Sequence, residues 1–185
     1  MGKVCVPLNE DMLKVKSLSM RVLLYILDNT ELTDNYNMCW TLDAGCLKRA
    51  YDEFSDMSAN RVRKSIDRAI SLLFHEDWDG NVVMIEGRLR KEYVLVYMNV
   101  GDIWKECNDI ECNVLMQMCL MTVRNRKPDE NPTFSLTSLT ETTGYTWNNS
   151  TMRNGIEESL KSLKAKGFIK YGKKGNKNEL LSLRI

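Results

Sequence analysis

The feature that most constrains the fold of this chain is a helical pattern near its C-terminus that stops at a glycine. Apolar residues recur at Ile156, Leu160 and Leu163, the three- and four-residue spacing of one buried helix face. Gly167 follows, and glycine commonly takes the left-handed conformation that ends a helix. The pattern therefore predicts an amphipathic helix with a fixed end, whose apolar face must pack on other elements.

The segments around this helix predict a small domain. Ser150 or Thr151 suits its N-cap, and a shorter helix with Thr137 as its cap is expected over residues 137–143. An apolar helix over 112–123 and a short strand at 134–136 come before. Residues 168–170 and 180–185 read as strands joined by a basic, glycine-containing turn at 172–178.

The first half of the chain predicts a similar series of elements. A helical pattern runs from Asn9 to residue 28, a short strand follows at 39–42, and Asp43 can cap the next helix. Ser58 can cap a third helix. Strands are then expected at 81–86 and 92–98, and the basic turn at 87–91 between them predicts a hairpin with a positively charged tip.

The two halves match in element order at an offset of about 90 to 95 residues. Trp40 falls opposite Phe134, and Phe74 falls opposite Phe168. The order is that of the winged helix, in which the second and third helices form a helix-turn-helix and the hairpin is the wing. We therefore expect an α+β fold, mainly α, of two tandem winged helix-turn-helix domains at residues 1–100 and 101–185. A linker helix is expected over about 101–109.

The stretch from 137 to 169 also resembles the winged-helix pattern of bacterial regulators and of phage or plasmid replication initiators. The matching residues are Arg153, Ile156, Leu160, Leu163, Gly167, Phe168 and Ile169. The resemblance covers the last third of the chain, whereas the first half matches by element order alone. The resemblance implies a non-enzymatic protein that binds double-stranded DNA sequence-specifically. Such a protein would act as a replication initiator or transcription regulator of a prokaryotic mobile element or phage.

The residues expected to contact DNA fall in the third helix and the hairpin of each domain, and in the C-terminal domain also in the turn before that helix. Helix side chains read base edges, and lysines neutralise phosphates. In the C-terminal domain they are Thr146, Asn148, Asn149, Ser150, Thr151, Arg153, Asn154, Lys173, Lys174 and Lys177. In the N-terminal domain they are Asn60, Arg61, Arg63, Lys64, Arg68, Arg88, Arg90 and Lys91.

Charge is distributed unevenly along the chain. The 26 Lys and Arg nearly balance the 25 Asp and Glu, for a net charge of +1, which argues against a histone-like, fully basic protein. Basic residues cluster at 61–68, 88–91 and 161–177, and acidic residues cluster at 102–111. Local basic surfaces for DNA are therefore compatible with a neutral total.

Other classes of site find little support in the sequence. Six cysteines occur without the spacing of a zinc site, and His75 is the single histidine, so we expect no metal, no cofactor and no catalytic site. No apolar run of about 18 residues is present, which favours no membrane contact and a reducing cytoplasm. Two readings stay open: the alternative function is a protein–protein interaction scaffold that does not bind DNA, and the N-terminal domain is a candidate surface for homodimer formation.

Overall fold

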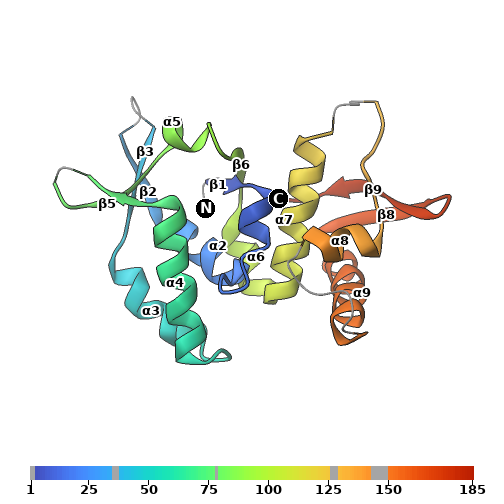
Figure 1. Cartoon of the computed structure of the whole chain (residues 1–185), viewed down its shortest axis with the longest axis horizontal. Helices are drawn as coiled ribbons and strands as arrows, with labels where there is room; N and C mark the ends of the chain where they lie inside the picture. Colours follow the sequence, from blue (N-terminus) through green and yellow to red (C-terminus); the bar gives the residue numbers. More distant parts are fainter. Residues whose placement is uncertain (1–2, 35–37, 78, 126–128, 143–149) are drawn as a thin grey trace. The chain divides into compact units, whose positions relative to one another are not determined.

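A computed structural model describes residues 3–34, 38–77, 79–125, 129–142 and 150–185 (Figure 1). The fold is α+β, with more residues in helices than in strands. The chain divides into two compact units. Unit 1 comprises Met1–Pro7 and Ser17–Glu106, and unit 2 comprises Leu8–Lys16 and Cys107–Ile185. The expected boundary was at residue 100, whereas the observed units assign 101–106 to unit 1 and 8–16 to unit 2.

The main helices of unit 1 are α2 (Met20–Asp28), α3 (Gly45–Glu53), α4 (Ala59–Leu73) and α6 (Val100–Glu106). Ser58 caps α4 as predicted, because its hydroxyl accepts a hydrogen bond from the backbone N–H of Arg61. The single long helix expected from Asn9 is interrupted. Ser19 caps a new helix through the N–H of Val22, and its own N–H donates to the Ser65 hydroxyl.

The strands of unit 1 form two sheets. β2 (Thr30–Asp34), β3 (Cys39–Leu42), β5 (Val82–Ile85) and β4 (His75–Glu76) lie side by side in that order, and β1 (Val4–Leu8) pairs with β6 (Val94–Met98). The predicted hairpin of 81–86 with 92–98 is therefore wrong. β5 pairs with β3 and β4, and helix α5 (Glu86–Leu89) replaces the expected turn (Figure 1).

The physical reason lies in side chains at both ends of β5. Leu89 is buried, so residues 86–89 close into a helical turn. At the other end, a carboxylate oxygen of Asp77 accepts hydrogen bonds from the N–H groups of Asp79 and Asn81, at 2.9 and 2.8 Å. Such an Asx turn reverses the chain without a helix or a glycine-rich loop. It joins β4 to β5, and the hairpin of unit 1 is thus at residues 75–85.

The core of unit 1 contains an aromatic cluster. The ring of Tyr25 in α2 lies 5.3 Å from that of Phe54 and 5.0 Å from that of Trp104, both edge to face. Such pairs add roughly 0.5–1.5 kcal/mol to the burial of their area. Because Trp104 belongs to α6, the segment expected as a linker is an integral part of this core.

Unit 2 contains α1 (Glu10–Leu13), α7 (Asp109–Val123), α8 (Leu136–Thr142) and α9 (Ser150–Ala165). Its strands β7 (Thr133–Phe134), β9 (Lys177–Leu183) and β8 (Ile169–Lys174) form one antiparallel sheet in that order. α7 is buried along residues 111–120. A capping box begins it, in which Asn108 and Glu111 each bind the other's backbone N–H.

The start of α8 differs from the prediction, whereas the end of α9 agrees with it. The cap of α8 is Ser135 and not Thr137, because the Ser135 and Ser138 hydroxyls accept hydrogen bonds from each other's N–H at 3.0 Å. The predicted end of α9 is confirmed, since Gly167 has φ +76. The N–H of Phe168 reaches the Leu163 carbonyl and that of Gly167 reaches Lys164, which is a Schellman motif.

The two units share the order of three sheet strands. In each, a strand before the second helix is followed, after the third helix, by a hairpin whose second strand lies in the middle of the sheet: β3-β5-β4 in unit 1 and β7-β9-β8 in unit 2. The repeat of element order predicted from the sequence is therefore present, with a different hairpin in unit 1 from the one expected.

Candidate nucleic-acid interface

Helix α9 presents a polar surface at its N-terminal half. Ile156, Leu160 and Leu163 are buried against unit 2, as their spacing predicted. Thr151, Arg153 and Asn154 are exposed. The burial of one face leaves the opposite face to solvent, so these three predicted residues lie where a ligand can reach them.

The other residues predicted in this region are placed less fully. Thr146, Asn148 and Asn149 lie outside the described residues, and Ser150 is the first residue of α9. Arg153 is 3.5 Å from Glu157 one turn later, and their side chains are 53% and 37% exposed. An exposed pair of this kind contributes about 0.3–0.5 kcal/mol. A phosphate or a base edge can therefore displace it at little cost.

The β8–β9 hairpin gathers the lysines predicted for its tip. Lys174 pairs with Lys177, and Lys173 pairs with Asn178, so Gly175 and Asn176 form a two-residue turn. Gly175 has φ +60, the left-handed conformation that such turns require. Lys173, Lys174 and Lys177 are exposed, and Lys174 forms an ion pair with Glu179 at 3.1 Å.

The hairpin and α9 are held in a fixed relation by the residues between them. Phe168, buried directly after the Schellman motif, accepts a hydrogen bond at its carbonyl from the N–H of Arg184 at 2.8 Å. Lys166, at the end of α9, forms an ion pair at 2.8 Å with the buried carboxylate of Glu111 in α7. The two candidate surfaces of unit 2 therefore belong to one rigid scaffold.

Electrostatics agree with this anchoring role of Glu111. Burial acts to raise the pKa of its carboxyl, but hydrogen bonds from Lys166, Ser162 and the Asn108 N–H together hold the pKa below its usual value. The carboxylate therefore stays ionised and paired at neutral pH.

In unit 1, the residues predicted on the third helix share one exposed surface of α4. They are Asn60, Arg61, Arg63, Lys64 and Arg68. Arg63 donates a hydrogen bond to the Asn60 side chain at 3.2 Å and lies 3.8 Å from Asp67. Val62, Ile66 and Ala69 are buried on the opposite side, so the basic surface follows from the amphipathic pattern of the helix.

The basic residues Arg88, Arg90 and Lys91 do not form a hairpin tip. Arg88 lies in α5, and Arg90 and Lys91 follow it. The guanidinium of Arg90 binds the carboxylate of Glu86, whose side chain is only 3% exposed. The Tyr97 hydroxyl donates to the same carboxylate at 3.1 Å. Arg90 thus neutralises a buried charge inside unit 1, which the spacing of basic residues alone did not indicate.

The hairpin that unit 1 does contain is acidic. Its turn follows Glu76 and carries Asp77 and Asp79. Partial desolvation raises the pKa of Asp77, but the N–H groups of Asn81 and Asp79 and the Asn81 amide outweigh this and lower it. The sequence carries a signal for this turn, because Asp77, Asp79, Gly80 and Asn81 are all turn-forming residues.

The remaining candidates are groups that could ligate a metal ion or act as nucleophiles. Within the described part of the chain, no group of three or more His, Cys, Asp and Glu is placed to hold a metal ion. All six cysteines are described and none forms a disulfide. Burial raises the pKa of Cys119 to about 12, so its thiol stays protonated and unreactive at neutral pH.

Two further observations concern membrane spans and similarity to known proteins. Among the helices that the structure describes, none has the length and apolar character needed to cross a membrane. Comparison with family models, curated proteins and solved structures gave no match to this chain.

Proposed function

We propose that this chain binds double-stranded DNA through unit 2, acting as a winged helix. In this proposal α9 enters the major groove and the β8–β9 hairpin lies on the flanking phosphates. The observation that carries the proposal is the pairing of an exposed polar surface on α9 with a lysine-rich hairpin tip, on elements locked together by Gly167, Phe168 and Lys166.

The side chains of the two surfaces suit different parts of the duplex. Arg153 can bind guanine through two hydrogen bonds, and Asn154 can bind adenine in the same way. The hydroxyl of Thr151 can donate to a phosphate. Lys173 and Lys177 place positive charge at a tip with no base-reading geometry, so they are assigned to phosphates and to affinity without sequence preference.

Unit 1 contributes less in this proposal. Its α4 surface carries Arg61, Lys64 and Arg68, which suit phosphates, whereas Asp77 and Asp79 in its hairpin repel them. An acidic hairpin favours contact with protein over contact with DNA. Pairing of two chains through unit 1 is therefore the second candidate for that unit, and light scattering of the purified chain over a range of concentrations tests it.

The biological role follows from occupancy of a specific site, because the proposed contacts bind DNA without altering it. Such a protein recruits or blocks other machinery, as a replication initiator or a transcription regulator of a prokaryotic mobile element or phage. Selection of bound fragments from the source genome distinguishes the two roles. Fragments at an origin support replication, and fragments at promoters support transcription.

The proposal is tested by fluorescence anisotropy of a labelled random duplex titrated with the full chain. Between about 50 and 200 mM salt, affinity should fall steeply, with a slope of roughly 0.9 for each neutralised phosphate on a double logarithmic plot. A chain that binds no duplex at the lowest salt would contradict the proposal and support the protein-interaction scaffold. Affinity that is independent of salt would contradict the assigned lysine contacts.

A further inference from the structure

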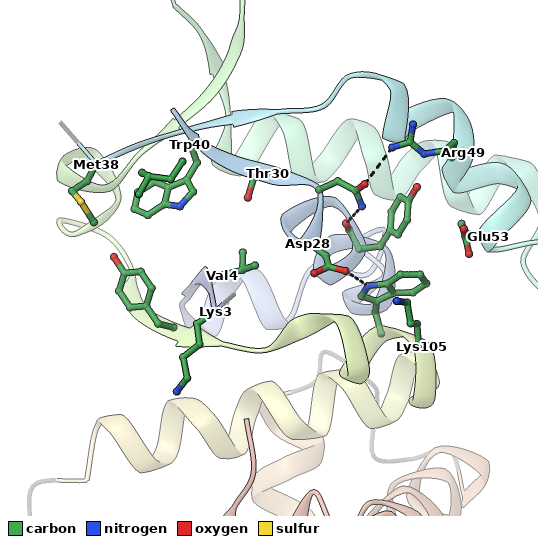
Figure 2. A pocket seen from close by; sticks show the side chains of 14 residues that line it. Lys3, Val4, Asp28, Thr30, Met38, Trp40, Arg49, Glu53 and Lys105 are labelled. Atoms are coloured by element: carbon green, nitrogen blue, oxygen red, sulfur yellow. Dashed lines mark hydrogen bonds between the residues drawn. The ribbon is translucent and has the colours of Figure 1, made fainter. Parts of the chain in front are cut away.

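Unit 1 contains an open cavity that takes no part in the proposed DNA surfaces. Its volume is about 750 Å³, within the range of roughly 300–1,000 Å³ typical of small-molecule sites. It lies among α2, the β2–β3 strands, α3, β6 and α6 (Figure 2). None of the basic residues of α4 lines it, so a ligand here would leave that helix surface open.

One part of the cavity is apolar and exposed. Leu32 is 43% exposed and Tyr97 is 39% exposed, and both line the cavity. The rings of Tyr97 and Trp40 lie 6.5 Å apart and tilted by 44°. Large apolar side chains that gather at a concave surface while still in contact with water indicate a binding site for an apolar body.

The centre of the cavity holds a carboxylate. Asp28 is half buried and accepts a hydrogen bond from the indole N–H of Trp104 at 2.9 Å. In Figure 2, Asp28 lies between Trp40 and Met38 at one end and Arg49, Glu53 and Lys105 at the other. A carboxylate accepts up to about four hydrogen bonds, so Asp28 keeps capacity for a donor on a ligand.

The cations around Asp28 are occupied or peripheral. Arg49 is exposed and forms an ion pair with Asp43 at 2.6 Å. The ammonium of Lys105 lies 5.2 Å from the centre of the Trp104 ring, and Lys3 is exposed. Within the ranges that the structure describes, none of the three forms an ion pair with Asp28. The most buried charge of the lining is therefore negative and lacks a cation, and aromatic walls also favour positive ligands.

We propose that this cavity binds a small organic cation with an apolar or aromatic body. Its ammonium group binds the Asp28 carboxylate, and its body packs against Leu32, Trp40 and Tyr97. The hydrogen bond from Trp104 and the fixed pair of Arg49 with Asp43 hold the polar side in place before binding, which reduces the entropic cost of association. This site is independent of the proposed DNA contacts.

Isothermal titration calorimetry of the full chain with three probes of one shape tests the sign of the charge. The probes are naphthylmethylammonium, neutral naphthylmethanol and anionic naphthylacetate. We expect the ammonium probe to bind at least about tenfold more tightly than the alcohol, the factor that one hydrogen-bonded ion pair of roughly 1.4 kcal/mol provides. Tighter binding of the anion, or no binding of the ammonium probe at millimolar concentration, would overturn the proposal.

Two variants locate the site. Asp28→Asn keeps the size and the acceptor for Trp104 but removes the charge, and should weaken the ammonium probe about tenfold while leaving the alcohol unchanged. Leu32→Ala should weaken all three probes. Asp52→Asn is the matched control, since this carboxylate is exposed on α3 and does not line the cavity. Equal loss in Asp28→Asn and Asp52→Asn would overturn the assignment. If Asp28→Asn fails to fold, the probe series on the unaltered chain still decides the sign.

Discussion

Units 1 and 2 share a three-strand sheet order, β3-β5-β4 and β7-β9-β8, but their hairpins differ in length and in charge. The β8–β9 hairpin of unit 2 is long and ends in lysines at 173, 174 and 177, whereas the β4–β5 hairpin of unit 1 is short and turns at Asp77 and Asp79. Sheet topology fixes where a hairpin emerges, and the residues of its turn fix what it can touch. The difference teaches that one sheet order can present a lysine-rich hairpin tip in one unit and an acidic turn in the other.

The largest effect on DNA affinity is expected from the lysines of unit 2. Lys173→Ala together with Lys177→Ala should lower affinity for any duplex roughly 10- to 100-fold at about 0.1 M salt and reduce the salt slope by about 2. Anisotropy titrations measure both. The matched control is Lys14→Ala with Lys16→Ala, which removes the same charge from exposed positions of unit 2 that belong to neither α9 nor the hairpin. Equal losses in the two double variants would mean that only net charge matters.

A more selective effect, confined to the preferred site, is expected at α9. Arg153→Ala should weaken binding to the preferred site by about 1–3 kcal/mol and binding to random DNA by much less, because a bidentate contact to a base discriminates sequence. Competition between a selected site and random duplex measures the ratio. Glu157→Gln serves as the control, since it removes the ion-pair partner of Arg153 and keeps the arginine. Equal losses of affinity for both duplexes would contradict base readout and assign Arg153 to a phosphate contact.

The basic residues of unit 1 near α5 should act on stability rather than on DNA. Arg90→Ala leaves the buried Glu86 carboxylate without its cation and should lower the free energy of unfolding by about 1–3 kcal/mol. Lys91→Ala, exposed and one residue later, should change it by less than about 0.5 kcal/mol. Urea denaturation of each full-length variant measures the difference. A loss of DNA affinity in Arg90→Ala with unchanged stability would restore the expected basic wing.

The smallest effect on stability is expected at the residue that ends the third helix, where the two units differ. Gly167 ends α9 in the left-handed conformation, while Phe74 ends α4 in an extended one. Gly167→Ala should therefore cost about 1–2 kcal/mol of stability. Gly172→Ala is the control, because an added Cβ would meet Leu181 at an ordinary 3.6 Å. Thermal unfolding measures both, and a Gly167→Ala variant as stable as the control would contradict the assigned helix end.

Local signals in the sequence predicted local structure well. The apolar spacing of α9, its end at Gly167 and the cap of α4 at Ser58 depend on residues within a few positions of each other. The error in unit 1 arose where pairing is non-local. β6 pairs with β1, which lies at the start of the chain, and β5 pairs with β4, which is only two residues long. Neither pairing can be predicted from the pattern of apolar residues around 81–98.

The candidate sites also differ in whether their residues are close together in the sequence. The lysines of the β8–β9 hairpin lie so close together in the sequence that their position at one hairpin tip could be predicted. The cavity of unit 1 draws Asp28, Leu32, Tyr97 and Trp104 from separate elements, and only the fold brings them together. Likewise, the pairing of Arg90 with Glu86 depends on the burial of that carboxylate, which spacing alone does not indicate.

The central claim is that unit 2 carries the principal contacts to duplex DNA through α9 and the β8–β9 hairpin. Amide hydrogen exchange of the full chain, with and without a saturating duplex, tests it most directly by comparing the two hairpins in one experiment. We predict protection at the start of α9 and around residues 173–178, with no change at residues 75–82. Protection confined to residues 75–82, or an unchanged α9 and β8–β9 hairpin under saturating DNA, would contradict it.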